Sequence, residues 1–69
     1  MQARSSLNLR SGAPTTEAPI TSTVSKGDSL GYVGWTSNGL TVNGNAHWYK
    51  TDTGLYFWAG ATTQPVPAI

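Results

Sequence analysis

The sequence predicts a small all-β barrel of five to six short strands. Three observations lead to this prediction. Aromatic and β-branched residues occur in short runs, Gly, Asn, Asp or Pro separate these runs at close spacing, and no stretch has the period of an amphipathic helix. A chain of 69 residues has room for one domain, and its strands are too few for a sandwich. A barrel also hides the strand edges through which sheets aggregate.

The first strand is expected within residues 5–11, after a frayed lead-in over residues 1–4. Leu7 and Leu9 alternate with polar residues there, which is the pattern of a strand with one buried face. The segment from Gly12 to Pro19 contains two prolines, which lack backbone donors, and begins with a glycine. It therefore predicts a loop that doubles back.

Two further strands are expected in the middle of the chain. Residues 20–24 are short and rich in β-branched side chains, and Gly27 supplies the turn that follows. Residues 29–36 are strand-like again, although Gly31 and Gly34 indicate bulges or a bend. Strong curvature of the sheet is the expected result.

Residues 37–45 leave two alternatives open. Two Asn-Gly pairs enclose a β-branched stretch, so the segment is either a long loop or a small extra hairpin. At the other end of the chain, residues 61–63 can add a last short pairing. Residues 64–69 form a proline-spaced tail or linker. The predicted domain is therefore 5–63.

An aromatic hairpin between these segments is the centre of the predicted fold. His47-Trp48-Tyr49-Lys50-Thr51 and Leu55-Tyr56-Phe57-Trp58-Ala59-Gly60 flank the turn sequence Asp52-Thr53-Gly54. The hairpin holds most of the aromatic residues, which bury more area than any other side chains, so the rest of the chain should pack on it. Side chains alternate along strands, and the period alone leaves open whether Trp48 and Trp58 or Tyr49 and Phe57 face the core.

The predicted core combines aliphatic residues at alternate strand positions with at least one indole of the hairpin. Its members are Leu7, Leu9, Ile20, Val24, Leu30 and at least one of Trp48 and Trp58. No cysteine is present, so no disulfide supplements this core and no thiolate can bind a metal.

Charge and composition narrow the possible partners. The net charge is +1, from four basic and three acidic residues, so neither nucleic acid nor an anionic membrane is expected as a partner. No apolar run reaches membrane-spanning length. Abundant Gly, Ser, Thr and Asn favour an extracellular or cell-surface module. Any export signal would lie upstream of this fragment, and a monomer is expected.

The sequence offers little material for catalysis. His47 is the only histidine and lies next to Trp48 in a predicted strand, so a nucleophilic triad is improbable. Asp28 and Asp52 are widely separated and each lies beside a turn, where Asp bonds its own backbone, which disfavours both a metal site and a paired-carboxylate glycosidase. No catalytic residue, cofactor or metal is therefore predicted.

The order of the segments resembles bacterial SH3 (SH3b) domains. LNLRSGAPTTEAPI resembles the opening of that family, VSKGDSL its second segment, and HWYKTDTGLYFWAG its hairpin with two tryptophans. The resemblance covers residues 5–63. Phe57 stands where many members have Gly, and AGATT lacks the usual Tyr-Leu ending. The resemblance implies an SH3-like barrel that binds cell-wall peptide or glycan and tethers a covalently attached hydrolase.

The resemblance also implies a groove between the 12–19 loop and the aromatic hairpin. Aromatic residues that the core does not need would line it, and polar side chains would add contacts. The candidate ligand-binding residues are Tyr32, Trp35, Tyr49 and Tyr56, with His47 and Asn8 as polar partners.

Two other functions are considered. The chain is alternatively a structural or regulatory module that packs on a neighbouring catalytic domain without binding wall polymer. A eukaryotic-type SH3 domain that binds proline-rich helices is disfavoured, because Glu17 is the only acid in the loop that would have to be acidic.

Overall fold

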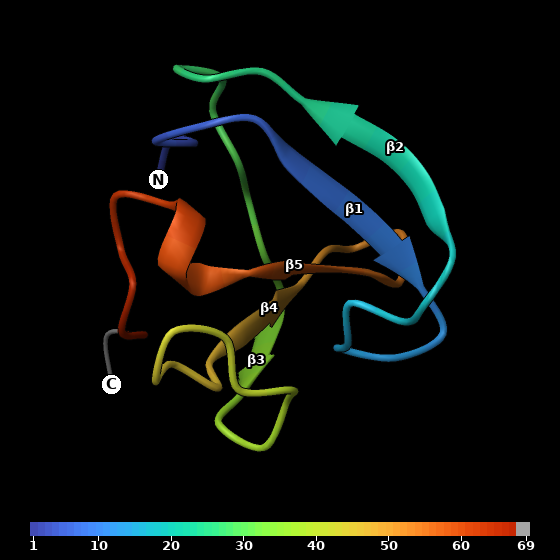
Figure 1. Ribbon diagram of the computed structural model, residues 1–69. Coiled ribbons are helices and arrows are strands. Elements are labelled where there is room, and N and C mark those ends of the chain that lie inside the picture. The colour runs from blue at the N-terminus through green and yellow to red at the C-terminus, as the bar shows by residue number, and fades with distance from the viewer. Residues whose placement is uncertain (68–69) are drawn as a thin grey trace.

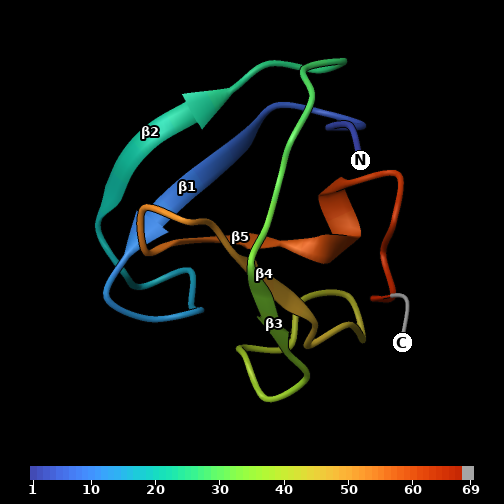
Figure 2. The ribbon, with the colours of Figure 1, turned by 180° about the vertical axis from the view of Figure 1, so that it is seen from behind.

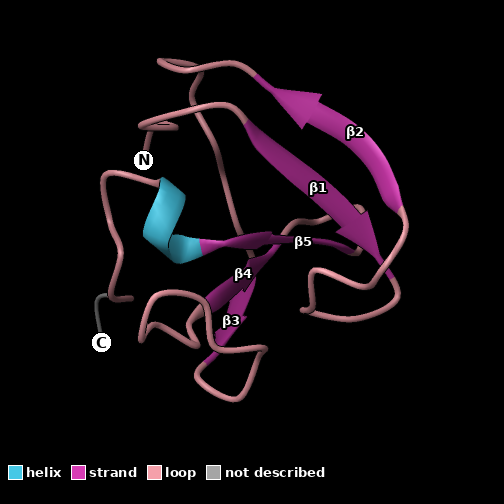
Figure 3. Ribbon diagram, in the orientation of Figure 1, coloured by secondary structure: helices cyan, strands magenta, loops and turns pink. Residues whose placement is uncertain are grey.

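The computed structural model describes residues 1–67 and is an all-β fold built on one sheet (Figures 1 and 3). The five strands are β1 (Leu7–Ser11), β2 (Ile20–Val24), β3 (Gly34–Thr36), β4 (Trp48–Lys50) and β5 (Leu55–Trp58). All pairings are antiparallel, in the order β2-β1-β5-β4-β3. One 3-10 turn, η1 (Ala59–Ala61), follows β5. The predicted small all-β, SH3-like fold of short strands is confirmed.

The aromatic hairpin forms as predicted. Trp48 pairs with Trp58, and Tyr49 with Phe57. The turn is closed by two backbone hydrogen bonds, from Thr51 N–H to the Leu55 carbonyl and from Gly54 N–H to the Thr51 carbonyl. Gly54 has φ of 84°, which explains why a glycine is needed there.

The core lies on the Tyr49 and Phe57 face of this hairpin. Both side chains are 0% exposed, and their ring centroids are 5.3 Å apart. The buried residues that complete this cluster are Ala3, Leu7 and Ala59, with Met1, Leu9, Val24, Leu30 and Ala61 packed half-buried around it. Tyr49, predicted to line a groove, is therefore a core residue. Its phenol O–H donates a hydrogen bond to the Gln64 carbonyl at 2.8 Å.

The opposite face of the hairpin is also covered. Trp48 is only 2% exposed, and its indole Nε1 donates to the Leu40 carbonyl at 2.9 Å. Residues 37–47 supply this cover, because Gly39 lies directly against the indole ring. Both aromatic pairs of the hairpin are thus used for packing, which resolves the alternative that the sequence left open.

Ile20 corrects the predicted core. It is 54% exposed, and the cause is a register shift between Leu9 and Arg10. In an unbroken register Ile20 would oppose Ser11 and share the face of Leu9, but the bulge places it opposite Arg10. The side chain therefore turns away from the core. Leu7 is buried, and Leu9 is half-buried.

The segment between β2 and β3 is less regular than predicted. Of residues 29–36 only Gly34–Thr36 forms a strand, and Ser29 makes an isolated bridge with Gln2. Figure 2 shows this segment running alongside the curved sheet from the end of β2 to β3. In the next segment, Val42 and Asn45 exchange two backbone hydrogen bonds around Asn43 and Gly44, both with positive φ. A minimal hairpin therefore forms within a longer loop.

Residues 1–3 and 62–65 pack on the barrel. Ala3 is buried, bridges Thr62 and donates its N–H to the Asp28 carbonyl, so the predicted frayed lead-in is instead ordered. The expected last pairing is confirmed by this bridge and by the bond from Thr63 N–H to the Gln2 carbonyl. In the tail, the Pro65 carbonyl accepts a hydrogen bond from Asn45 Nδ2. Residues 68–69 of the predicted linker lie outside the described residues.

Candidate functional site

The outer face of the aromatic hairpin carries two depressions. Cross-strand partners share a face, so Trp48 and Trp58 lie together near one end of this face, while Lys50 and Tyr56 lie together near the other. The 12–19 loop reaches the segment that covers Trp48, where the Pro14 carbonyl accepts a hydrogen bond from Leu40 N–H at 2.9 Å. One depression lies beside each pair.

The first depression, here called the tyrosine groove, has a volume of about 330 Å³. Its residues are Pro14, Gly34, Trp35, Thr36, Lys50 and Tyr56. Trp35 is 42% exposed on the edge strand β3. It is the cross-strand partner of Tyr49, so its side chain projects from the opposite face to Lys50 and Tyr56 and it borders the groove at the edge of the sheet. Lys50 Nζ lies 5.8 Å from the centroid of the Tyr56 ring, which places a cation over an aromatic face.

His47 extends this surface at the Trp35 ring. The two ring centroids are 6.4 Å apart. Asn45 Oδ1 accepts the backbone N–H of His47 at 2.8 Å and lies 2.8 Å from His47 Nδ1. Because Asn45 Nδ2 donates to the Pro65 carbonyl, Oδ1 is the acceptor end of the amide, so His47 Nδ1 carries a proton. Nε2 is then the acceptor of the neutral ring.

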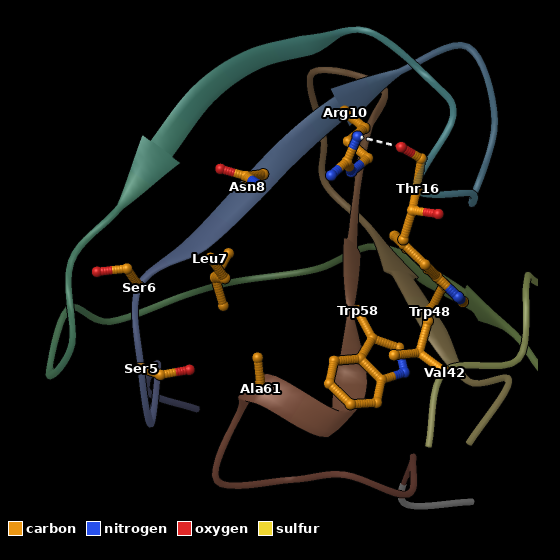
Figure 4. Close-up of a pocket in the computed structure, with 10 residues that line it drawn as sticks. All are labelled: Ser5, Ser6, Leu7, Asn8, Arg10, Thr16, Val42, Trp48, Trp58 and Ala61. Atoms are coloured by element: carbon orange, nitrogen blue, oxygen red, sulfur yellow. Dashed lines mark hydrogen bonds between the residues drawn. The ribbon is translucent and has the colours of Figure 1, made fainter. Parts of the chain in front are cut away.

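The second depression, here called the indole pocket, has a volume of about 220 Å³ and is drawn in Figure 4. Its residues are Ser5, Ser6, Leu7, Asn8, Arg10, Thr16, Val42, Trp48, Trp58 and Ala61. The Trp58 indole is fixed by a hydrogen bond from Nε1 to the Asn45 carbonyl at 3.0 Å and by close packing against Gly60. The walls are therefore rigid aromatic and aliphatic surfaces with polar groups on the β1 side.

Arg10 is the charged group of the indole pocket. Its Nη1 donates to the Thr16 carbonyl at 2.7 Å and to the Ala18 carbonyl at 2.9 Å. These bonds hold the 12–19 loop against β1. They also fix the guanidinium at one end of the pocket, as Figure 4 shows for the bond to Thr16.

The predicted ligand-binding residues are distributed over several places. Trp35 and Tyr56 line the tyrosine groove, with His47 beside Trp35, and Asn8 lines the indole pocket. Tyr32 lies in a third depression with Leu30 and Asp52, and its ring centroid is 4.5 Å from that of Tyr49. Tyr49 itself has no exposed surface and cannot stack on a ligand in this conformation.

Sequence reasoning named Asn8 of the indole pocket but missed its Arg10. The alternation of Arg10 with Leu7 and Leu9 places it on the outer side of β1, which is the one signal that was present. Two carbonyls of the 12–19 loop accept hydrogen bonds from the Arg10 guanidinium. Their position depends on the path of the loop, and no local sequence pattern specifies that path.

Burial also affects one titratable group near these sites. It raises the pKa of the Tyr49 phenol above its ordinary value, and the neighbouring Tyr32 phenol raises this pKa further. Within residues 1–67, no three His, Asp or Glu side chains lie close enough to share a metal ion. No helix in the same range is long and apolar enough to cross a membrane.

Comparison of the chain with protein-family models, with curated proteins and with solved structures found no match.

Proposed function

We propose that this chain is a non-catalytic binding module that directs a covalently attached enzyme to the bacterial cell wall. The tyrosine groove is the observation that supports this proposal most directly. It is open, it is lined by Trp35 and Tyr56, and Trp35 keeps 42% of its surface in water. A shallow groove beside Tyr56, with the exposed Trp35 at the edge of the sheet, suits an extended peptide or the flat face of a sugar.

The choice of cell-wall polymer as the ligand rests on the resemblance of residues 5–63 to SH3b domains. An extracellular or cell-surface location and a monomeric state are parts of the same proposal. His47 supports a binding role, since its contacts are Asn45 and the Trp35 ring. In the neutral ring its Nε2 is an acceptor for a ligand hydroxyl or amide beside the aromatic surface.

Sedimentation with purified peptidoglycan tests the proposal. The wild-type domain should sediment with the polymer, and Trp35→Ala should weaken binding by about 30-fold, the equivalent of a 2 kcal/mol anchor. Val66→Ala is a matched control, because Val66 is 62% exposed but lies outside the groove. Its affinity should equal that of the wild type.

Salt gives a second comparison in the same assay. With a net charge of +1, binding should change little between low and high ionic strength. Binding that disappears in salt and is indifferent to Trp35→Ala and Tyr56→Ala would contradict the proposed groove. A domain that does not sediment at all would favour the alternative module that packs on a neighbouring catalytic domain.

A further inference from the structure

The indole pocket has the chemistry of a site for an organic anion. Arg10 is fixed on its rim, and the hydrogen bonds of this guanidinium go to the Thr16 and Ala18 carbonyls rather than to a carboxylate. Glu17, between these two residues in the chain, is exposed. The positive charge of Arg10 is thus positioned by uncharged partners and remains available to a ligand.

The donors that Arg10 has left are the ones a carboxylate requires. A guanidinium has five N–H groups, and both bonds to the loop use Nη1. Nε–H and the Nη2 amino group remain, and these two nitrogens form the parallel fork that binds both oxygens of a carboxylate. The contacts that fix the side chain therefore leave its bidentate edge unoccupied.

The other residues that line the pocket indicate which chemical groups the rest of the ligand carries. Leu7, Val42 and Trp58 offer apolar surface, and Figure 4 shows Asn8 on β1 and Ser6 just before it on one side of the Trp58 indole. Hydroxyl and amide groups suit a peptide bond, and the apolar walls suit a small aliphatic side chain. The volume of about 220 Å³ is below the range typical of drug-sized ligands, so only one or two residues fit.

We propose that the indole pocket is a second binding site, separate from the tyrosine groove, and that it holds the C-terminal residue of a short peptide by its free carboxylate on the Nε and Nη2 edge of Arg10. The occupant is a peptide end rather than an internal segment, because only the end has a carboxylate attached directly to the backbone. This site does not depend on the ligand proposed for the tyrosine groove.

The test compares N-acetyl-alanyl-alanine with its C-terminal amide, which has the same shape without the charge. NMR spectra of the wild-type domain are followed up to about 20 mM ligand, which saturates a site with a Kd of about 1 mM. The acid should shift the Trp58 indole N–H and Arg10 Nε–H signals and bind at least tenfold more tightly than the amide. Equal binding of both compounds, or no shift at Trp58 and Arg10, would overturn the proposal.

Two variants then test whether Arg10 is the residue that binds the carboxylate. Arg10→Gln should reduce the affinity for the acid to that of the amide, whereas Arg4→Gln, which removes an exposed cation outside the pocket, should leave it unchanged. Equal loss in both variants would indicate general charge attraction and contradict the site. If Arg10→Gln fails to fold, the comparison of acid and amide on the wild type still decides. The L,L and D,D forms distinguish a protein C-terminus from a wall peptide that ends in D-alanine.

Discussion

Positions 39 and 60 require glycine, because tryptophan rings occupy the space where a larger side chain would lie. A Cβ on Gly39 would overlap Cδ1 of Trp48, and a Cβ on Gly60 would overlap Cζ2 of Trp58. Neither indole is free to move away, since each Nε1 is bonded to a backbone carbonyl. The two glycines thus set how closely the surrounding segments approach the outer face of the hairpin.

Gly39→Ala should therefore lower the free energy of unfolding by about 1–3 kcal/mol, as overpacking does. Urea denaturation measures the change. Gly31→Ala is the control, because a Cβ there meets no atom within 4 Å, and it should be neutral or slightly stabilising. A Gly39→Ala protein as stable as the control would show that the Trp48 ring is not tightly enclosed.

Tyr49 predicts how stability depends on pH. Burial raises the pKa of its phenol in the folded state above the ordinary value of about 10. Above pH 10 the unfolded chain releases this proton first, so the folded state then holds more protons than the unfolded state. The folded state therefore loses stability as the pH rises further. The stability associated with Tyr49 is complete below about pH 10 and declines above it.

Tyr49→Phe isolates this contribution. At pH 7 the variant should be less stable by about 1 kcal/mol, because it loses the hydrogen bond to the Gln64 carbonyl. As the pH rises beyond 10, the wild type should lose stability faster than the variant, and the difference should shrink or reverse. Parallel stability curves for the two proteins up to pH 11 would contradict the burial of Tyr49.

At the scale of elements, the bulge in β2, where Thr21 is the extra residue, decides which side chains of the first hairpin are buried. Leu7 precedes the register shift and pairs with Val24, whereas Ile20 lies beyond it and opposes Arg10. The same chain reversal therefore sends one aliphatic residue into the core and another into water. On its other side Arg10 pairs with Tyr56 of β5, which continues the sheet.

Leu7→Ala should accordingly cost about 2–5 kcal/mol, the usual range for truncation in a core. Ile20→Ala should change the free energy of unfolding by less than about 0.5 kcal/mol, as exposed substitutions do. Chemical denaturation of the two variants against the wild type tests the register directly. Similar losses at both positions would mean that Ile20 packs in the core and that β2 has no bulge at Thr21.

The sequence patterns predicted where strands and turns lie better than they predicted which face of a strand is buried. The aromatic hairpin was predictable because Asp52-Thr53-Gly54 specifies a turn between two runs of strand-forming residues. The burial of Tyr49 was not, because alternation gives two faces and the choice depends on what covers each. Here the core residues cover one face and residues 37–47 cover the other, and both are tertiary effects.

At the scale of the whole molecule, segments distant in sequence complete the barrel. Met1 exchanges backbone hydrogen bonds with Leu30, and Ala3 and Thr62 are both buried where the N-terminal segment meets residues 62–63. These contacts join residues that are far apart in the sequence, so no local sequence pattern predicts them. A frayed N-terminus was expected for this reason. Removing residues 1–4 would uncover this junction as well as shorten the chain.

The expected groove between the 12–19 loop and the aromatic hairpin stays a prediction as a binding site. Depressions do lie between the 12–19 loop and the aromatic hairpin, and Trp35 and Tyr56 line one of them. Tyr32 faces a different depression. Composition indicated a surplus of aromatic residues, but the path of each loop determined which of them remained exposed.

The three tryptophans provide the most direct test of the binding function. Trp48 and Trp58 have indole N–H groups bonded inside the protein, whereas Trp35 is 42% exposed beside the tyrosine groove. Soluble peptidoglycan fragments can be titrated into the domain while its indole and amide NMR signals are recorded. The Trp35 indole signal and the amide signals of Lys50 and Tyr56 should shift together and saturate. If these three signals stay in place at saturating fragment concentrations, the tyrosine groove is not a cell-wall binding site.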